Sequence, residues 1–571
     1  MATKKSKASK GTKKNKTSAK ASNNKKSVKT DNTTEQTDTL SNDAIATTTA
    51  TETVEHKPFS YDEMPYESFP YSQTHPPHLS TLASLFGLET PDLENMRVLE
   101  LGCAAGGNII PLAVDYPNAE FVGIDLSKEQ TDIGKKQVKD MKLKNIKIEH
   151  LSIADLNDQF GTFDFVLCHG VFSWVPDEIS DKILSICKNQ LSPKGLAVIS
   201  YNCLPGWSAV RSVRDMMIYH TKRFDSLDMK ADQAKALVDF LHKHCEKNSP
   251  YKGILEHEQK VLKRTRKDYI THEYLEDDNT QYYFYEFIDK AKTHDLQYVG
   301  DSALATMYSG NMPKAAIQKL QSMGDIVTQE QYMDFIRNRR FRHTILTHAD
   351  RKISRRIEPD KIEAMYVHST YKPKQAIRNN NDPVEFIRPG QKAALKLSHP
   401  VAKLALAKFG ETPGNPTKIA DIIDFVDKTL GMEDRDAVKN MVIDATAQLA
   451  LRGSIKLSVE GARWVNDLSD TPKLAPLPLY QAKQETQKWI TNGLRQKISV
   501  TPVSKFIMSL CDGTHTKEDI INKLAEEMDE QGWSVRSKGE IVDDENRKQQ
   551  AIKNLVDNTI AESKRRFLLV G

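Results

Sequence analysis

The sequence predicts an α/β protein that begins with a doubly wound sheet domain and continues with a mostly helical middle domain and a C-terminal winged-helix-like domain. Between residues 97 and 202, short β-branched runs alternate with helix-like stretches, as in a parallel sheet covered by helices on both faces. After about residue 210 the strand pattern fades into helical, aromatic-rich sequence. Near the C-terminus, two similar helical patterns are each followed by another helix and a short apolar piece, which indicates a winged helix.

The strands of the sheet are expected where β-branched residues cluster. The first three are separated by polar stretches of helical spacing that are long enough for crossover helices. Ligands of such sheets bind at the carboxyl ends of the strands, so we expect the chemistry at those ends. The expected strands are residues 97–101, 120–125, 146–151, 163–170 and 195–202.

Composition and charge limit the remaining possibilities. The 571 residues suffice for three or four folded units, and 39% hydrophobic with 28% charged residues is ordinary globular composition. The six cysteines form no CxxC pair, so we expect neither a metal site nor a disulfide framework. No apolar run approaches the ~20 residues that span a bilayer, and we expect a cytoplasmic protein.

The domain boundaries follow from shifts in composition. Residues 1–55, with eleven Lys in the first thirty positions, contain too few apolar side chains to fold and are predicted to be disordered. The turn-rich stretch 379–390 is expected to be a linker. The predicted divisions are the tail at 1–55, the sheet domain at 56–210, a helical domain at 211–305, a middle region with the linker at 306–394, and the winged-helix-like domain at 395–571.

The strongest motif is VLELGCAAGGN, residues 98–108, in which a buried strand runs into a glycine-rich turn and then a helix. Gly102 and Gly106 allow a ligand to approach the backbone and the helix N-terminus. Glu100, at the strand end, suits a cationic ammonium and would oppose a pyrophosphate. The turn also lacks the GxGxxG spacing of dinucleotide folds, although a dinucleotide enzyme stays open at this point.

Two carboxylates extend this ligand site along the next strands. Asp125 ends the second strand, where a carboxylate accepts two hydrogen bonds from a ribose diol. Asp155 follows the third strand, where it can accept a hydrogen bond from an adenine amino group. The alternative is that both glycines only turn the chain and that both aspartates are helix caps. A ligand with an amino acid end, a ribose and an adenine is S-adenosylmethionine, which we expect as the cofactor.

These residues resemble the class I S-adenosylmethionine-dependent methyltransferases. The segments YESFPYSQTHPPHL, SYNCLPGW, HEYLEDDN and RNRRFRHTIL narrow the resemblance to bacterial members with a methyltransferase regulatory domain, among them the rickettsial protein lysine methyltransferases that modify outer-membrane proteins. The resemblance implies a Rossmann-like methyltransferase sheet at 56–210, a regulatory domain at 211–305 and methyl transfer to protein lysine.

The acceptor site is expected beside the fourth and fifth strands. The [NDS]PP[YFW] tetrapeptide of nucleic-acid amino methyltransferases is absent there, and LCHGVFSWVPD occupies its place at residues 167–177. Aromatic faces attract a sulfonium or ammonium group. We therefore predict His169, Trp174, Tyr201 and Asn202 as acceptor-site residues, although packing in the core would also explain Trp174.

Three classes of substrate stay open from the sequence alone. The first is a protein substrate, such as an outer-membrane or surface protein before export. The second is a small molecule, with the C-terminal domains serving assembly into a homo-oligomer. The third is nucleic acid, because the tail and the run RNRRFRH at 337–343 are basic. The helical patterns at 420–431 and 518–530 are acidic, which is unlike a DNA recognition helix and makes nucleic acid the weakest of the three.

Overall fold

The computed structural model describes residues 60–411, 416–464, 469–534, 536–537, 540–541 and 544–570. The predicted disordered tail at 1–55 lies outside these ranges, so it stays a prediction.

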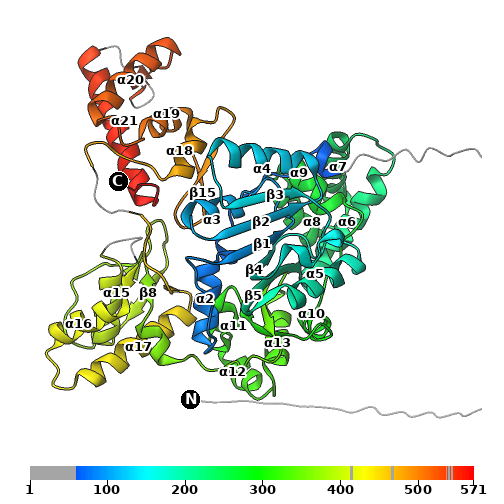
Figure 1. The fold of residues 1–571 in the computed structure, drawn as a ribbon, viewed down its shortest axis with the longest axis horizontal. Helices are drawn as coiled ribbons and strands as arrows, with labels where there is room; N and C mark the ends of the chain where they lie inside the picture. The colour runs from blue at the N-terminus through cyan, green and yellow to red at the C-terminus, as the bar shows by residue number, and fades with distance from the viewer. Residues whose placement is uncertain are drawn as a thin grey trace, which may run out of the picture. The chain divides into compact units, whose positions relative to one another are not determined.

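A seven-stranded mixed sheet in the order β3-β2-β1-β4-β5-β7-β6 forms the centre of the first part of the chain (Figure 1). The first five strands are parallel, whereas β7 runs antiparallel to both of its neighbours. The chain order reverses between β1 and β4, and this reversal opens a crevice at the carboxyl ends of these strands. The strands are β1 (Arg97–Leu101), β2 (Glu120–Asp125), β3 (Ile146–His150), β4 (Phe163–Cys168), β5 (Leu191–Asn202), β6 (Leu296–Asp301) and β7 (Phe341–His348).

Helices cover both faces of the sheet because its strands are buried on both sides. Along β1, Val98 packs into one hydrophobic cluster while Leu99 and Leu101 pack into the cluster on the other face. The first cluster includes α2 (Pro76–Leu85) and α3 (Ile109–Asp115), with α4 (Lys128–Asp140) beside them. The second includes α5 (Asp177–Asn189) and α10 (Phe284–Lys292). These layers confirm the predicted fold class and all five predicted strands.

The sheet continues past residue 210, where the sequence analysis places the end of the methyltransferase domain. After β5 the chain leaves the sheet, forms a helical segment with its own apolar cluster, and returns to add β6 and β7. This inserted segment consists of α6 (Trp207–Thr221), α7 (Leu227–His244), α8 (Pro250–Leu262), α9 (Lys267–Ile270) and the π-helical turn η4 (Thr271–Leu275). A helical insertion therefore separates the strands of one sheet, which lie on both sides of residue 210.

The basic run 337–343 is largely internal. Arg342 is 1% exposed, and its guanidinium forms ion pairs with Glu330 at 3.0 Å and with Asp334 at 2.7 Å. Arg339 pairs with the buried Asp301 at 2.6 Å. Glu330 and Asp334 lie on α13 (Ile326–Arg337), so the run fastens this helix to β7 and is unlike a phosphate-binding surface.

Two helical units with short strands follow the sheet domain, and the first has the predicted order of helix, helix and strand. In the second, the apolar piece after the last helix forms only a bridge between Leu569 and Leu474. The first contains α15 (Pro400–Phe409), α16 (Ile419–Leu430), α17 (Arg435–Leu451) and the sheet β12 (Thr417–Lys418), β8 (Tyr366–His368), β13 (Lys456–Ser458). The second contains α18 (Pro476–Lys483), β14 (Trp489–Thr491), β15 (Lys497–Ser499), α19 (Pro502–Leu510), α20 (Lys517–Glu530) and α21 (Glu545–Arg565).

The stretch 379–390 is not a plain linker. It contains β10 (Val384–Ile387), which pairs with β9 (Lys372–Pro373) and β11 (Ala394–Leu397). Val384 and Phe386 are buried, and this alternation was hidden in the sequence by the turn residues around it. Across the described ranges, no helix combines the length and the apolar character that a membrane crossing requires.

Candidate active site

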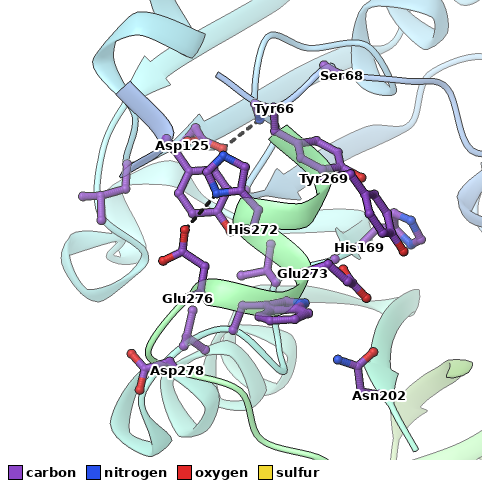
Figure 2. Close-up of a pocket in the computed structure, with 18 of the residues that line it drawn as sticks. Tyr66, Ser68, Asp125, His169, Asn202, Tyr269, His272, Glu273, Glu276 and Asp278 are labelled. Carbon is purple, nitrogen blue, oxygen red and sulfur yellow. Dashed lines mark hydrogen bonds and ion pairs between the residues drawn. The ribbon is translucent and has the colours of Figure 1, made fainter. Parts of the chain in front are cut away.

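A cavity of about 870 Å³ lies at the carboxyl ends of β1, β2 and β4. Its walls come from three parts of the chain: the strand ends, the segment that precedes the sheet, and the inserted helical segment (Figure 2). Of the nine predicted site residues, six line this cavity: Glu100, Gly102, Asp125, His169, Trp174 and Asn202.

The glycine-rich turn after β1 forms the floor of the cavity. Gly102 has a φ of 72°, and a Cβ at this position would collide with the side chain of Val171. Ala104 donates its backbone N–H to Asp125 at 2.7 Å, and Ser127 donates to the other Asp125 oxygen at 2.9 Å. Burial raises the pKa of Asp125, while these two N–H groups oppose the shift. Asp125 therefore holds the turn in place and retains lone pairs for a ligand.

Glu100 is a buried carboxylate with a free oxygen. It is 4% exposed, and Asn108 donates a hydrogen bond to its Oε1 at 2.7 Å. Its Oε2 is buried without a hydrogen-bond partner among the described residues. Burial raises the pKa of Glu100 to about 8. A cationic group in the cavity would satisfy this oxygen and favour its ionised form.

Three predicted site residues lie outside the cavity wall. Gly106, with a φ of 77°, packs against Ile110 and so shapes the turn. Asp155 is exposed at the end of η2 (Ile153–Asp155), and the cavity is lined there by Ser152 and Ile153 instead.

Tyr201 points into the hydrophobic core. Its ring stacks on Phe287 with centroids 4.0 Å apart, and its hydroxyl lies 3.0 Å from Thr344 Oγ1. It does not line the cavity because successive residues of β5 face opposite sides of the sheet, and the neighbouring Asn202 faces the cavity instead.

His169 and Asn202 bring uncommitted polar atoms to the cavity wall. The His169 ring lies 3.8 Å from the ring of Tyr71 and is stacked on His343 at 5.1 Å. Burial lowers the pKa of His169 well below its usual value, so the ring is neutral near pH 7. Asn202 is 1% exposed, and its Nδ2 lacks a hydrogen-bond partner among the described residues.

Trp174 forms an aromatic part of the same wall. It packs against Trp207 with ring centroids 6.1 Å apart, and both residues line the cavity.

The segment before the sheet also lines the cavity, although none of its residues is among the nine predicted site residues. Ser68 accepts a hydrogen bond from the backbone N–H of Gly107 at 2.8 Å. A Cβ at Gly107 would collide with the Ser68 backbone, so the glycine permits this close approach. Gln130 donates to the carbonyl of Tyr66 at 2.7 Å. The signal in the sequence was the aromatic and proline-rich composition of residues 61–79.

The inserted segment supplies the opposite wall, through Tyr269, His272, Glu273 and Glu276. His272 lies with its Nδ1 2.8 Å from Glu276 and its Nε2 2.7 Å from the carbonyl of Met64, so this residue joins the two walls (Figure 2). The block HEYLEDDN contains His272, Glu273 and Glu276, and Tyr269 lies three residues before it. Neither periodicity nor spacing assigned these residues to the site.

Family models match three parts of the chain. A methyltransferase domain matches residues 92–291, a predicted methyltransferase regulatory domain matches 266–348, and the C-terminal winged helix domain of PKMT matches 470–568. The residues matched by the regulatory domain include η4, β6 and β7, so they contribute both to the cavity wall and to the sheet.

A solved structure extends the similarity over nearly the whole chain. PKMT2 from Rickettsia typhi, in complex with AdoHcy, is 34% identical, with a TM-score of 0.81 over 89% of this chain and 100% of that chain. The chain belongs to the class I methyltransferase family of PKMT2. Its similarity to the protein RP789 of Rickettsia prowazekii is 39% identity over 94% of this chain and 98% of that protein. The protein RP028 of the same organism is 44% identical over 41% of this chain and 94% of its own length. The resemblance drawn from the sequence motifs is thereby confirmed.

Proposed function

We propose that this methyltransferase uses S-adenosylmethionine to methylate lysine side chains of a protein substrate. The observation that carries the proposal is the similarity to PKMT2, a relative matched over its whole length and solved with AdoHcy. A surface or outer-membrane protein before export is the target class that the resemblance implies.

The residues of the cavity fit this cofactor. The free Oε2 of Glu100 suits the ammonium of the amino acid end, and Asp125 suits the ribose hydroxyls. Gly102 lets the ligand approach the backbone of the turn, and Gly106 gives the turn its shape. Ser152 and Ile153 line the wall next to Asp155 and are the better placed to contact the adenine. When bound, S-adenosylmethionine supplies a methyl group on a positively charged sulfur.

Lysine places a specific demand on the other end of the cavity. The pKa of a lysine ammonium group is near 10.4, so only about 0.1% of lysine side chains are neutral near pH 7.4. Only the neutral amine is a nucleophile. The amine nitrogen forms the bond to the methyl carbon while the carbon–sulfur bond breaks and its electron pair stays on sulfur. The neutral ring of His169, the face of Trp174 and the amide of Asn202 surround the space where this amine would lie.

The alternatives have less support. The nucleic-acid interpretation depended partly on the run 337–343, whose Arg339 and Arg342 form internal ion pairs. Among the described residues of the cavity, none favours a small molecule over lysine as the methyl acceptor.

The distribution of transferred label tests the proposal. The full-length protein is incubated with methyl-labelled S-adenosylmethionine and a cell extract, and the label is measured in the protein, RNA and small-molecule fractions. We expect label in protein, and less label with the Asp125→Ala variant at a low cofactor concentration. Label confined to RNA or to small molecules would overturn the proposal.

A further inference from the structure

Glu273 lies in the π-helical turn η4 (Thr271–Leu275), where the inserted segment faces the cavity. A π-helical turn displaces its side chains from the register of an α-helix and is frequent at functional sites. On this turn, His272 bonds to Glu276 and to the carbonyl of Met64, whereas Glu273 faces the part of the cavity nearer to His169 (Figure 2).

Among the described residues, no hydrogen bond and no ion pair is found for the carboxylate of Glu273. The two arginines that influence it electrostatically are engaged elsewhere. Arg340 pairs with Glu258 at 3.5 Å, and Arg214 donates to the backbone carbonyl of Glu276.

Glu273 titrates near neutral pH, as Glu100 does at the cofactor end of the same cavity. Burial raises its pKa to about 7, against the opposing effects of Arg340 and Arg214. Burial also raises the pKa of Tyr66 to about 12, and it raises the pKa values of Tyr71 and Tyr269.

The remaining groups on this wall do not neutralise the carboxylate. The neutral ring of His169 adds no charge. Glu276, Asp277 and Asp278 also line the cavity and add negative charge, part of which is taken up by the contact of Glu276 with His272.

Asn202 provides a second uncommitted group in the same cavity. Asn202 and Glu273 both line the cavity, and their side chains are drawn on the same side of the view in Figure 2. No hydrogen bond to the Asn202 side chain is found within the described ranges, and its Nδ2 is buried. Buried amides and carboxylates usually have partners, so two free groups facing one space indicate that a polar ligand group completes them.

We propose that Glu273 binds the ammonium group of the target lysine and accepts its proton before methyl transfer. This inference depends on the proposed lysine methylation. The ionised carboxylate of Glu273 attracts the lysine ammonium to a position beside the aromatic residues of the cavity wall. A proton then moves from the lysine nitrogen to an oxygen of this carboxylate. The neutral amine then bonds to the methyl carbon as the carbon–sulfur bond breaks, and Glu273 releases its proton to solvent. Asn202 orients the amine through its side-chain amide.

The test compares pH profiles of kcat/KM for the wild type and Glu273→Gln, with a peptide that contains the lysine mapped by mass spectrometry. At saturating S-adenosylmethionine, whose ammonium would keep Glu100 ionised, the wild type takes the abundant ammonium form of the peptide lysine. Its kcat/KM for the peptide should then rise up to about pH 7 and stay level to about pH 9.5. The variant can use only the neutral amine, so its kcat/KM should be lower by up to about 1000-fold near pH 7.4 and rise about tenfold per pH unit.

Two further variants and a binding measurement separate proton acceptance from a structural role. Asp278→Asn removes a carboxylate from an exposed position of the same cavity and should keep the level profile. Glu273→Asp keeps the negative charge. Its kcat/KM should be higher than that of Glu273→Gln and should again rise up to about pH 7 and then level off. AdoHcy binding by calorimetry should be unchanged in Glu273→Gln.

The outcomes are distinct. A Glu273→Gln variant with the wild-type profile would overturn the role of Glu273 and leave lysine methylation intact. If Glu273→Gln fails to bind AdoHcy, the pH profile of the wild type tests the proposal instead. A wild-type kcat/KM that rises continuously to about pH 9.5 would exclude an ionised carboxylate as the acceptor of the lysine proton. A wild type that yields no methyllysine would overturn both proposals.

Discussion

Replacing Glu100 with Gln should make the ligand-free protein more stable at alkaline pH and, at the same time, weaken cofactor binding. The unfolded chain loses the Glu100 proton near pH 4.5, whereas the folded protein keeps it until about pH 8. Between these values the folded state binds more protons, so the free energy of unfolding falls as the pH rises. Gln does not titrate, and its Oε1 can still accept the hydrogen bond from Asn108.

The magnitude follows from the same values. Moving a carboxyl pKa from 4.5 to about 8 corresponds to roughly 5 kcal/mol as an upper bound, at about 1.36 kcal/mol per pKa unit. For the cofactor, loss of a hydrogen bond to a charged group costs about 1.5 to 3 kcal/mol, which is about tenfold to 150-fold in Kd.

Thermal unfolding and calorimetry measure the two effects. The Tm of Glu100→Gln should equal that of the wild type near pH 4.5 and exceed it increasingly toward pH 8.5. Titration with AdoHcy at pH 8 should show the weaker binding. A variant that is less stable than the wild type at pH 8.5 and binds AdoHcy equally well would refute the assignment of Glu100 to the ammonium.

Two further substitutions test the cofactor and acceptor ends of the cavity. Asp125→Ala removes the acceptor for the ribose hydroxyls and for the Ala104 N–H, so AdoHcy binding in calorimetry should weaken tenfold or more; binding within twofold of wild type contradicts the assignment. Tyr201→Phe should lower the free energy of unfolding by about 1 kcal/mol, because the hydroxyl contact with Thr344 is lost, and should leave kcat/KM nearly unchanged. A large loss of kcat/KM with unchanged cofactor affinity would show instead that Tyr201 acts in the acceptor site.

The parallel part of the sheet could be predicted because each of its strands is a short β-branched run between helical stretches. β6 and β7 could not be predicted as part of this sheet, because the inserted helices separate them in the sequence from β5, beside which β7 lies. The run 337–343 misled for a related reason. Local composition shows that the run is basic. Its partners come close only when the chain folds: Arg342 pairs with Glu330 and Asp334. Arg339 pairs with Asp301.

The site was predictable to the extent that it depends on strand ends. Glu100, Gly102 and Asp125 follow from the position of their strands, and all three line the cavity. Tyr201 and Asn202 were chosen together, yet adjacent residues of a strand face opposite sides, and the sequence did not indicate which one faces the cavity. Glu273 escaped notice because its position depends on a π-helical turn in a distant segment.

Residue-level mass spectrometry tests the central claim most directly. The purified protein is incubated with S-adenosylmethionine carrying a deuterated methyl group and with extracted surface proteins, and the digested proteins are searched for the label. The account predicts deuterated mono-, di- or trimethyllysine at defined positions, formed by the wild type and formed more slowly by Asp125→Ala at a low cofactor concentration. Deuterated methyl groups found only on other side chains, or on no protein residue at all, would contradict it.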